Sequence, residues 1–236
     1  MTEKLIEYKA VSISRQEFSI LEQVDFSLAK GEFVYAIGKV GSGKSSLMKT
    51  MYAELGIDAG SASVLGYQLD KIKRSEIPYL RRKIGIVFQD FQLLTDRSVY
   101  DNLLFVLKAT GWKKKDEMDQ RIEEVLAQVG MDHKGYKMPH ELSGGEQQRI
   151  VIARAMLNHP KIILADEPTG NLDPETGEKI VTLLHDISKK GTAIIMATHN
   201  RSLTRQFPGR VILIESQRLV ELAKESEEKQ KMPILG

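Results

Sequence analysis

The fold is decided by one stretch, Gly38-Lys39-Val40-Gly41-Ser42-Gly43-Lys44-Ser45, in which spaced glycines lead to a lysine and a hydroxyl residue. The apolar run Phe33–Ile37 precedes it, and Leu47, Met51 and Leu55 follow it at helical spacing. Strand, glycine-rich loop and helix in this order form the context that a phosphate-binding loop requires. The stretch therefore predicts a P-loop fold in which the first strand-to-helix turn holds phosphate.

The composition of the loop suits this chemistry. Glycines let consecutive backbone N–H groups turn toward phosphate oxygens, and the helix N-terminus adds a partial positive charge. Lys44 is expected to reach the β- and γ-phosphates, and Ser45 to ligate Mg²⁺. The predicted phosphate-binding residues are Gly38, Lys39, Val40, Gly41, Ser42, Gly43, Lys44, Ser45 and Ser46.

The remaining strands and helices indicate an α/β fold. Apolar, β-branched runs that alternate with helical patterns predict a parallel, RecA-like sheet covered on both faces; they are Ile84–Phe88, Ile162–Ala165, Thr192–Ala197 and Val211–Ile214. Shorter alternating runs predict a small antiparallel flank, at Leu5–Ala10, Val24–Leu28 and Ser61–Leu65. Helical spacing at 101–110, 115–129 and about 143–157 predicts an inserted helical subdomain, whose apolar face includes Met118, Ile122, Val125, Leu126 and Val129.

We therefore expect a single domain over residues 1–236. Its core comprises 1–89 and 160–222, its helical subdomain 90–159, and its flexible tail 223–236. The 34 basic and 32 acidic residues nearly balance, which argues against a dedicated nucleic-acid binder. The absence of cysteine excludes disulfides, thiolate metal sites and a cysteine nucleophile. No signal peptide is expected, and no apolar stretch approaches the roughly 20 residues that span a bilayer.

Two carboxylates end the apolar run 162–165. Asp166 at such a strand end can hold Mg²⁺ through water, and Glu167 can polarise an attacking water as a general base. Alone, this ending is equally typical of a solvated turn. Together with the phosphate-binding loop, it favours phosphoryl chemistry.

A second anion site is predicted at Leu142–Arg149. Ser143 fits the N-cap of a helix and Glu146 its third position, which together form a capping box. The backbone N–H groups of Gly144 and Gly145 at this helix start favour an anion. A plain capping box has the same local geometry, and the two interpretations are compatible. A single ATP does not need both helix starts from one protomer.

In this order the motifs resemble those of ABC ATPases. Gln89 falls at the family's glutamine loop, Asn171–Asp173 resembles the D-loop, and His199 resembles the switch histidine. The resemblance implies an ATP hydrolase that forms a head-to-tail homodimer when ATP is bound. It implies catalytic roles for Lys44, Gln89, Glu167 and His199, Mg²⁺ ligands at Ser45, Gln89 and Asp166, and ATP contacts across the dimer from Ser143, Gly144, Gly145 and Glu146.

Within the family, Leu94–Asn102 and Leu142–Arg149 are similar to the FtsE group, with Glu146 where many relatives have Gln. The LolD and MacB groups are near neighbours. The FtsE resemblance implies an FtsX-like integral membrane partner, a peripheral position on the cytoplasmic face of the inner membrane, and control of septal peptidoglycan hydrolysis. A LolD- or MacB-like complex for lipoprotein release or efflux is the alternative. An ABC ATPase with no membrane partner is a remote one, and no nucleic-acid partner is expected.

Three surface features carry further expectations. The family's adenine-stacking aromatic is missing from Ile13–Gln16, so Phe18 or Arg15 is the substitute. The basic residues of 71–74 and 81–83 are interpreted as a solvated helix face, with an acidic membrane or nucleic acid as alternatives. Phe91 and Leu94, which follow Gln89, are interpreted as exposed docking residues for a partner helix, with core packing as the alternative.

The loop motif generates a direct prediction. Lys44→Ala removes a charge-assisted phosphate contact, usually worth about 1.5–3 kcal/mol, so ATP affinity and hydrolysis should both fall. Calorimetric titration with MgATP checks this. Unchanged affinity would contradict the role of Lys44.

Overall fold

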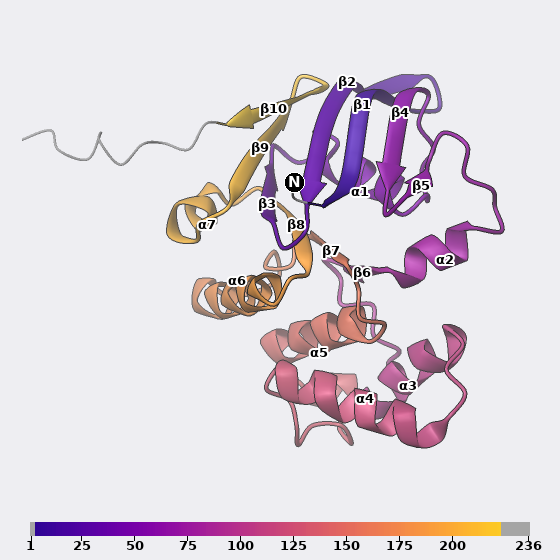
Figure 1. Cartoon of the computed structure of the whole chain (residues 1–236). Helices are drawn as coiled ribbons and strands as arrows, with labels where there is room; N and C mark the ends of the chain where they lie inside the picture. The colour runs from indigo at the N-terminus through magenta and orange to yellow at the C-terminus, as the bar shows by residue number, and fades with distance from the viewer. Residues whose placement is uncertain (1–2, 223–236) are drawn as a thin grey trace, which may run out of the picture.

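The computed structural model describes residues 3–222, so the predicted flexible tail lies outside the described residues. Its central sheet has the strand order β10-β9-β3-β8-β7-β6 (Figure 1). All neighbouring pairs are parallel except β10 with β9. The strands are β3 (Phe33–Ile37), β6 (Ile84–Val87), β7 (Ile162–Asp166), β8 (Ala193–Thr198), β9 (Arg210–Glu215) and β10 (Arg218–Leu222). The predicted parallel core is confirmed.

The antiparallel flank is also confirmed, but its first two strands are longer than predicted. This sheet has the order β2-β1-β4-β5 and comprises β1 (Lys4–Arg15), β2 (Phe18–Ala29), β4 (Ala59–Val64) and β5 (Tyr67–Gln68). The β1–β2 pairing shifts register, among other places, between Tyr8 and Val11. Such bulges break the apolar–polar alternation, and the sequence pattern therefore shows only part of each strand.

Helices connect the parallel strands and cover the sheet. They are α1 (Lys44–Met51), α2 (Ile77–Arg82), α3 (Val99–Ala109), α4 (Lys115–Gln128), α5 (Gly144–Met156), α6 (Pro174–Lys189) and α7 (Arg201–Gln206), with a 3₁₀ turn η1 at Pro139–Glu141. The expected extension of α1 to Leu55 is wrong. The helix ends at Met51 because the chain turns at Ala53, which has a positive φ of 54°.

The sequence-predicted apolar face of α4 is buried in full, at Met118, Ile122, Val125, Leu126 and Val129. The expected side-chain cap begins α5, where Ser143 accepts from the N–H of Glu146. Helix α6 is capped in the same way by Asp173, which accepts from the N–H of Thr176. Figure 1 shows α3, α4 and α5 grouped together at the end of the molecule opposite the antiparallel sheet.

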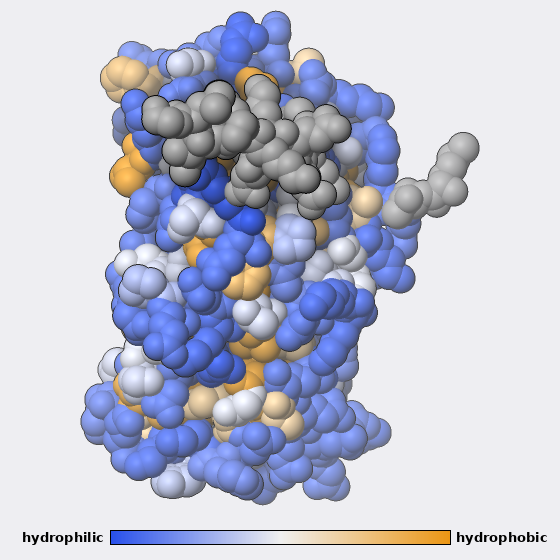
Figure 2. Space-filling view, turned by 90° about the vertical axis from the view of Figure 1, so that its left-hand side faces the viewer, coloured by the Kyte–Doolittle hydropathy of each residue, from blue (hydrophilic) through white to orange (hydrophobic). Residues whose placement is uncertain are grey.

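Two hydrophobic clusters meet at the central sheet. Strand β3 contributes Phe33, Tyr35 and Ile37 to the cluster that includes the apolar faces of α3, α4, α5 and α6. Its alternate residues Val34 and Ala36 belong to the cluster shared with α1 and the antiparallel sheet. Because both faces are covered, the sheet edges carry the polar chemistry. Figure 2 shows one outer face, which is mostly hydrophilic with a narrow strip of hydrophobic residues near its middle.

The basic segments are exposed, as expected of a solvated surface, but only part of them is helical. Residues 71–74 lie in the loop before α2, while Arg81 and Arg82 end that helix. Arg81 is held by the carbonyls of Tyr52 and Ala53. Among residues 3–222, no helix combines the length and apolar character that crossing a membrane requires.

Candidate active site

The polar residues predicted from separate motifs gather at one edge of the central sheet. Because β3, β6, β7 and β8 are parallel, their carboxyl ends share that edge. The glycine-rich loop follows β3, Gln89 follows β6, Asp166 ends β7, and His199 follows β8. This edge is where ligands bind in open α/β sheets.

The glycine-rich loop has positions that only glycine fits. A Cβ on Gly38 would lie 2.4 Å from the carbonyl oxygen of Ile214. Gly43 precedes α1 with a φ of 107°, and a Cβ there would lie 2.9 Å from Ile20 on β2. The loop is therefore wrapped tightly over the N-terminus of α1. The substitute candidate for adenine stacking, Phe18, begins β2 two residues before Ile20 and is 76% exposed.

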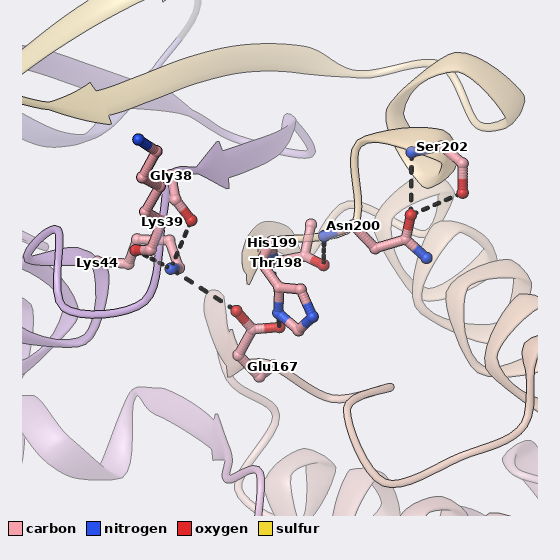
Figure 3. A network of polar contacts seen from close by, with 8 residues as sticks. All are labelled: Gly38, Lys39, Lys44, Glu167, Thr198, His199, Asn200 and Ser202. Carbon is pink, nitrogen blue, oxygen red and sulfur yellow. Dashed lines mark hydrogen bonds and ion pairs between the residues drawn. The ribbon is translucent and has the colours of Figure 1, made fainter.

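Lys44 is the buried cation of this loop, with 6% of its surface exposed. Its ammonium donates to the carbonyl oxygens of Gly38 at 2.9 Å and Lys39 at 3.0 Å (Figure 3). Its carboxylate neighbour is Glu167, with Nζ and Oε1 3.7 Å apart. A buried charge is stable only when it is paired and hydrogen-bonded, and this ion pair is long. The position therefore favours a further anion.

Glu167 joins Lys44 to His199. Its Oε2 lies 3.0 Å from His199 Nδ1 and accepts from the His199 backbone N–H at 3.4 Å (Figure 3). Glu167 also has a positive φ of 48°, while its N–H donates to the carbonyl of Ala197. A non-glycine residue in this region of φ/ψ space is strained, and such residues cluster at functional sites.

The segment that carries His199 is held by hydrogen bonds among residues 198–202. The N–H of Asn200 donates to Thr198 Oγ1, and the Asn200 side chain accepts from the N–H of Ser202 at the start of α7. The histidine thus stands on a capped turn at the end of a fully buried strand. These bonds fix the backbone beside His199, whose ring lies next to Glu167.

Two buried oxygens beside the loop have no hydrogen-bond partner among residues 3–222, Asp166 Oδ1 and Ser42 Oγ. An unsatisfied buried group costs about 1–3 kcal/mol, more for charged groups. No three His, Cys, Asp or Glu side chains in this part of the chain cluster as a metal cage. Mg²⁺ usually needs one or two carboxylates and completes its shell with water and substrate phosphate. Asp166 and the hydroxyl of Ser45 fit that requirement.

Gln89 is exposed and lies against the 170–173 segment. Asn171 Nδ2 donates to the Gln89 carbonyl at 3.2 Å, and a Cβ on Gly170 would lie 3.3 Å from Gln89 Nε2. The predicted glutamine loop and D-loop are therefore direct neighbours.

The start of α5 is a capping box, as predicted. Glu146 Oε2 accepts from the backbone N–H and the hydroxyl of Ser143, and Oε1 pairs with Lys134. The hydrogen bond from the Ser143 N–H keeps the pKa of Glu146 below its usual value. The carboxylate thus already occupies part of this helix start. Among the described residues, no hydrogen bond or ion pair joins Ser143–Glu146 to the glycine-rich loop.

Sequence reasoning missed two residues that hold the backbone between Gln89 and α3. Arg154 on α5 donates to the carbonyls of Phe91 and Gln92, just beyond Gln89. Burial lowers the pKa of its guanidinium. Asn102 is 3% exposed and binds the backbone at Leu94, Arg97 and Ser98. Both could have been found in the sequence, because each is a polar residue on the otherwise apolar face of a predicted helix.

Strand β3, the glycine-rich loop and α1, with the acidic pair after β7, define a P-loop nucleoside triphosphatase. A family model described as ABC transporter matches residues 21–170. The cell division ATP-binding protein FtsE of Streptococcus pneumoniae is 48% identical over 200 residues, covering 85% of this chain and 86% of that protein.

Solved structures agree with these sequence matches. Cassette cbiO1 from Clostridium perfringens, part of the ABC transporter complex cbiONQ, superposes with a TM-score of 0.85 at 29% identity over 92% of this chain and 87% of its own. The dimeric cassette MJ0796 bound to ADP and Pi gives a TM-score of 0.80 at 31% identity, covering 92% and 99%.

The chain belongs to the ABC transporter family. It is an ATP-binding, ATP-hydrolysing subunit of the FtsE type.

The contact of Glu167 with Lys44 and His199 generates a prediction. Glu167→Gln keeps the shape of the side chain but loses the proton acceptor, so hydrolysis should drop roughly 10²–10⁴-fold. ATP binding should survive and hold two chains together. A steady-state ATPase assay and light scattering with MgATP check this. Hydrolysis at the wild-type rate would show that Glu167 is not the base.

Proposed function

We propose that this chain is the ATPase subunit of an FtsE-like membrane complex, and that it drives the complex by binding and hydrolysing ATP with Mg²⁺. It works as a single domain, with a core at 1–89 and 160–222 and a helical subdomain at 90–159. The observation that carries the proposal is the position of Lys44, a buried cation between two carbonyls and the distant carboxylate of Glu167.

In this mechanism the γ-phosphate of ATP enters between Lys44 and Glu167. The buried ammonium then pairs with phosphate oxygens, which are better hydrogen-bond partners than the carboxylate 3.7 Å away. Glu167 is released from Lys44 but stays beside His199, and it orients the attacking water. Ser45 and Asp166, with Gln89, would hold Mg²⁺, which neutralises charge on the phosphates.

The second half of each nucleotide site comes from a second copy. The start of α5, where Ser143 is exposed and Gly144 and Gly145 are half-buried, offers the backbone N–H groups of these glycines to an anion, and the Ser143 hydroxyl joins them when it turns away from Glu146. It has no contact with the glycine-rich loop of its own chain through a hydrogen bond or ion pair among the described residues. A head-to-tail dimer brings it to the partner's ATP. Glu146 contributes by holding Ser143 in its cap.

The membrane partner docks on the exposed loop and first turns of α3. A pocket of about 380 Å³ lies there, lined by Asp96, Arg97, Ser98, Asp101, Leu104, Phe105, Lys108 and Met138. Phe105 is 49% exposed and Leu94 37%. The expected exposure of Phe91 is wrong, because this residue is half-buried against the core cluster.

The loop at 94–98 before α3, which we call the docking loop, is linked to the candidate site through α5. Asn102 holds the loop at Leu94, and Arg154 holds the carbonyls between Gln89 and that loop. A displacement of the docking loop by the partner is therefore transmitted to Gln89 and to the helix that starts after Ser143. The partner is an FtsX-like integral membrane protein, and the complex acts in cell division by controlling septal peptidoglycan hydrolysis. The chain lies on the cytoplasmic face of the inner membrane through that partner.

The docking surface generates a prediction. Leu94→Asp and Phe105→Asp should each abolish co-purification of the membrane partner, because an apolar contact is replaced by a charge. Nucleotide binding and melting temperature should stay unchanged, since both side chains are exposed. Affinity purification from membranes, with mass spectrometry of the co-purifying integral protein, is the measurement.

Val220→Asp on β10 is the matched control, because Val220 is 53% exposed and lies on another part of the surface. It should retain the partner. Partner retention by both docking variants would move the interface elsewhere. A lipoprotein-sorting permease in place of an FtsX-like protein would favour the LolD- or MacB-like alternative.

A further inference from the structure

A second pocket lies at the edge of the central sheet opposite the nucleotide site. Its volume is about 380 Å³. Lys161 directly precedes β7, Gly191 and Thr192 directly precede β8, and Lys30 lies just before β3. Because these strands are parallel, their amino ends share an edge away from the glycine-rich loop. The pocket is therefore separate from the site that binds ATP.

The wall of this pocket is strongly basic. Three lysines line it, Lys30, Lys161 and Lys190. Among residues 3–222, none of these lysines forms an ion pair, because no carboxylate oxygen comes within 4.0 Å of their ammonium groups. Glu3 is the acidic residue among the lining side chains. A concave surface with one sign of charge focuses its field and attracts small ions of the opposite sign.

The remaining wall comes from the helical part of the molecule. Arg121 on α4 is 6% exposed, donates to the carbonyls of Met156 and Leu157, and pairs with Glu124. His159 lies beyond the end of α5, and the pKa of its imidazole is lowered by burial and then by the charge of Arg121. The lining also includes the buried apolar side chains of Leu5, Met156 and Ile187.

We propose that this basic pocket binds a small phosphate-bearing molecule, distinct from the ATP at the glycine-rich loop. The three lysines supply charge-assisted hydrogen bonds to phosphate oxygens, and the apolar lining accepts a non-phosphate part of the ligand. The volume lies at the lower end of the range for small-molecule sites. A flat lipid surface would touch the exposed lysines but not the cavity behind them.

The position of the pocket gives its ligand a structural consequence. The lysines belong to the loops before β3, β7 and β8, while Arg121 and His159 belong to α4 and the end of α5. One bound molecule would touch both groups of elements and hold them together. Since α5 also carries Ser143 and Arg154, the pocket is connected to the site through that helix.

The experiment follows the imidazole of His159 by NMR while inorganic pyrophosphate is added. The nucleotide site is first saturated with a non-hydrolysable ATP analogue and Mg²⁺, so the glycine-rich loop does not compete. The His159 resonance is assigned by its loss in His159→Gln. We expect a saturable shift at constant pH, because a bound anion raises the pKa of a neighbouring histidine.

Charge reversal tests the pocket directly. Lys161→Glu with Lys190→Glu should weaken the pyrophosphate affinity at least ~tenfold, whereas Lys73→Glu, an exposed lysine before α2, should leave it unchanged. Equal melting temperatures show that the double variant is folded; if it is not, Lys161→Gln with Lys190→Gln takes its place. Absence of a His159 shift, or an equal shift in the folded double variant, overturns the proposal. Lysine-dependent binding to phosphatidylglycerol vesicles without a response to pyrophosphate also overturns it, and assigns the lysines to a membrane surface.

Discussion

The buried ammonium of Lys44 is the constraint on which the rest of the site depends. It has two backbone carbonyls within hydrogen-bond distance, but its carboxylate neighbour is 3.7 Å away. A charge removed from water is costly unless close partners compensate for it. In the proposed mechanism, phosphate oxygens supply that compensation. The backbone around Lys44 is shaped by three residues: Gly38, which has no room for a Cβ, and Gly43 and Glu167, which both have a positive φ.

Helix α5 contacts several parts of the candidate site. Its first turn presents Ser143, a Cβ on its Gly145 would lie 2.5 Å from Thr176 of α6, and its Arg154 holds the segment after Gln89. Protein interiors are close-packed, so a displacement of one of these groups is transmitted to its neighbours. In the proposed complex the helix links the nucleotide of a second copy, the glutamine loop and the docking surface.

The sequence predicted the parts of the molecule that local chemistry determines. Strand β3, the cap Ser143 and the buried face of α4 follow from patterns within a few residues. The lengths of β1 and β2 were not predictable, because bulges interrupt their alternation. The roles of Asn102 and Arg154, and the basic pocket, depend on residues far apart in the chain. Only the folded chain brings those residues together.

In the proposed dimer, each ATP lies between the glycine-rich loop of one chain and the start of α5 of another. Mixing two inactive variants, Lys44→Ala and Ser143→Arg, tests it most directly. In a head-to-tail dimer the mixed pair contains one site with both an intact Lys44 and an intact Ser143. With random pairing, half of all dimers in an equimolar mixture are mixed, and each mixed dimer has one intact site of its two. The mixture should therefore regain up to about a quarter of wild-type ATPase activity. A mixture no more active than the separate variants at any ratio would contradict the account.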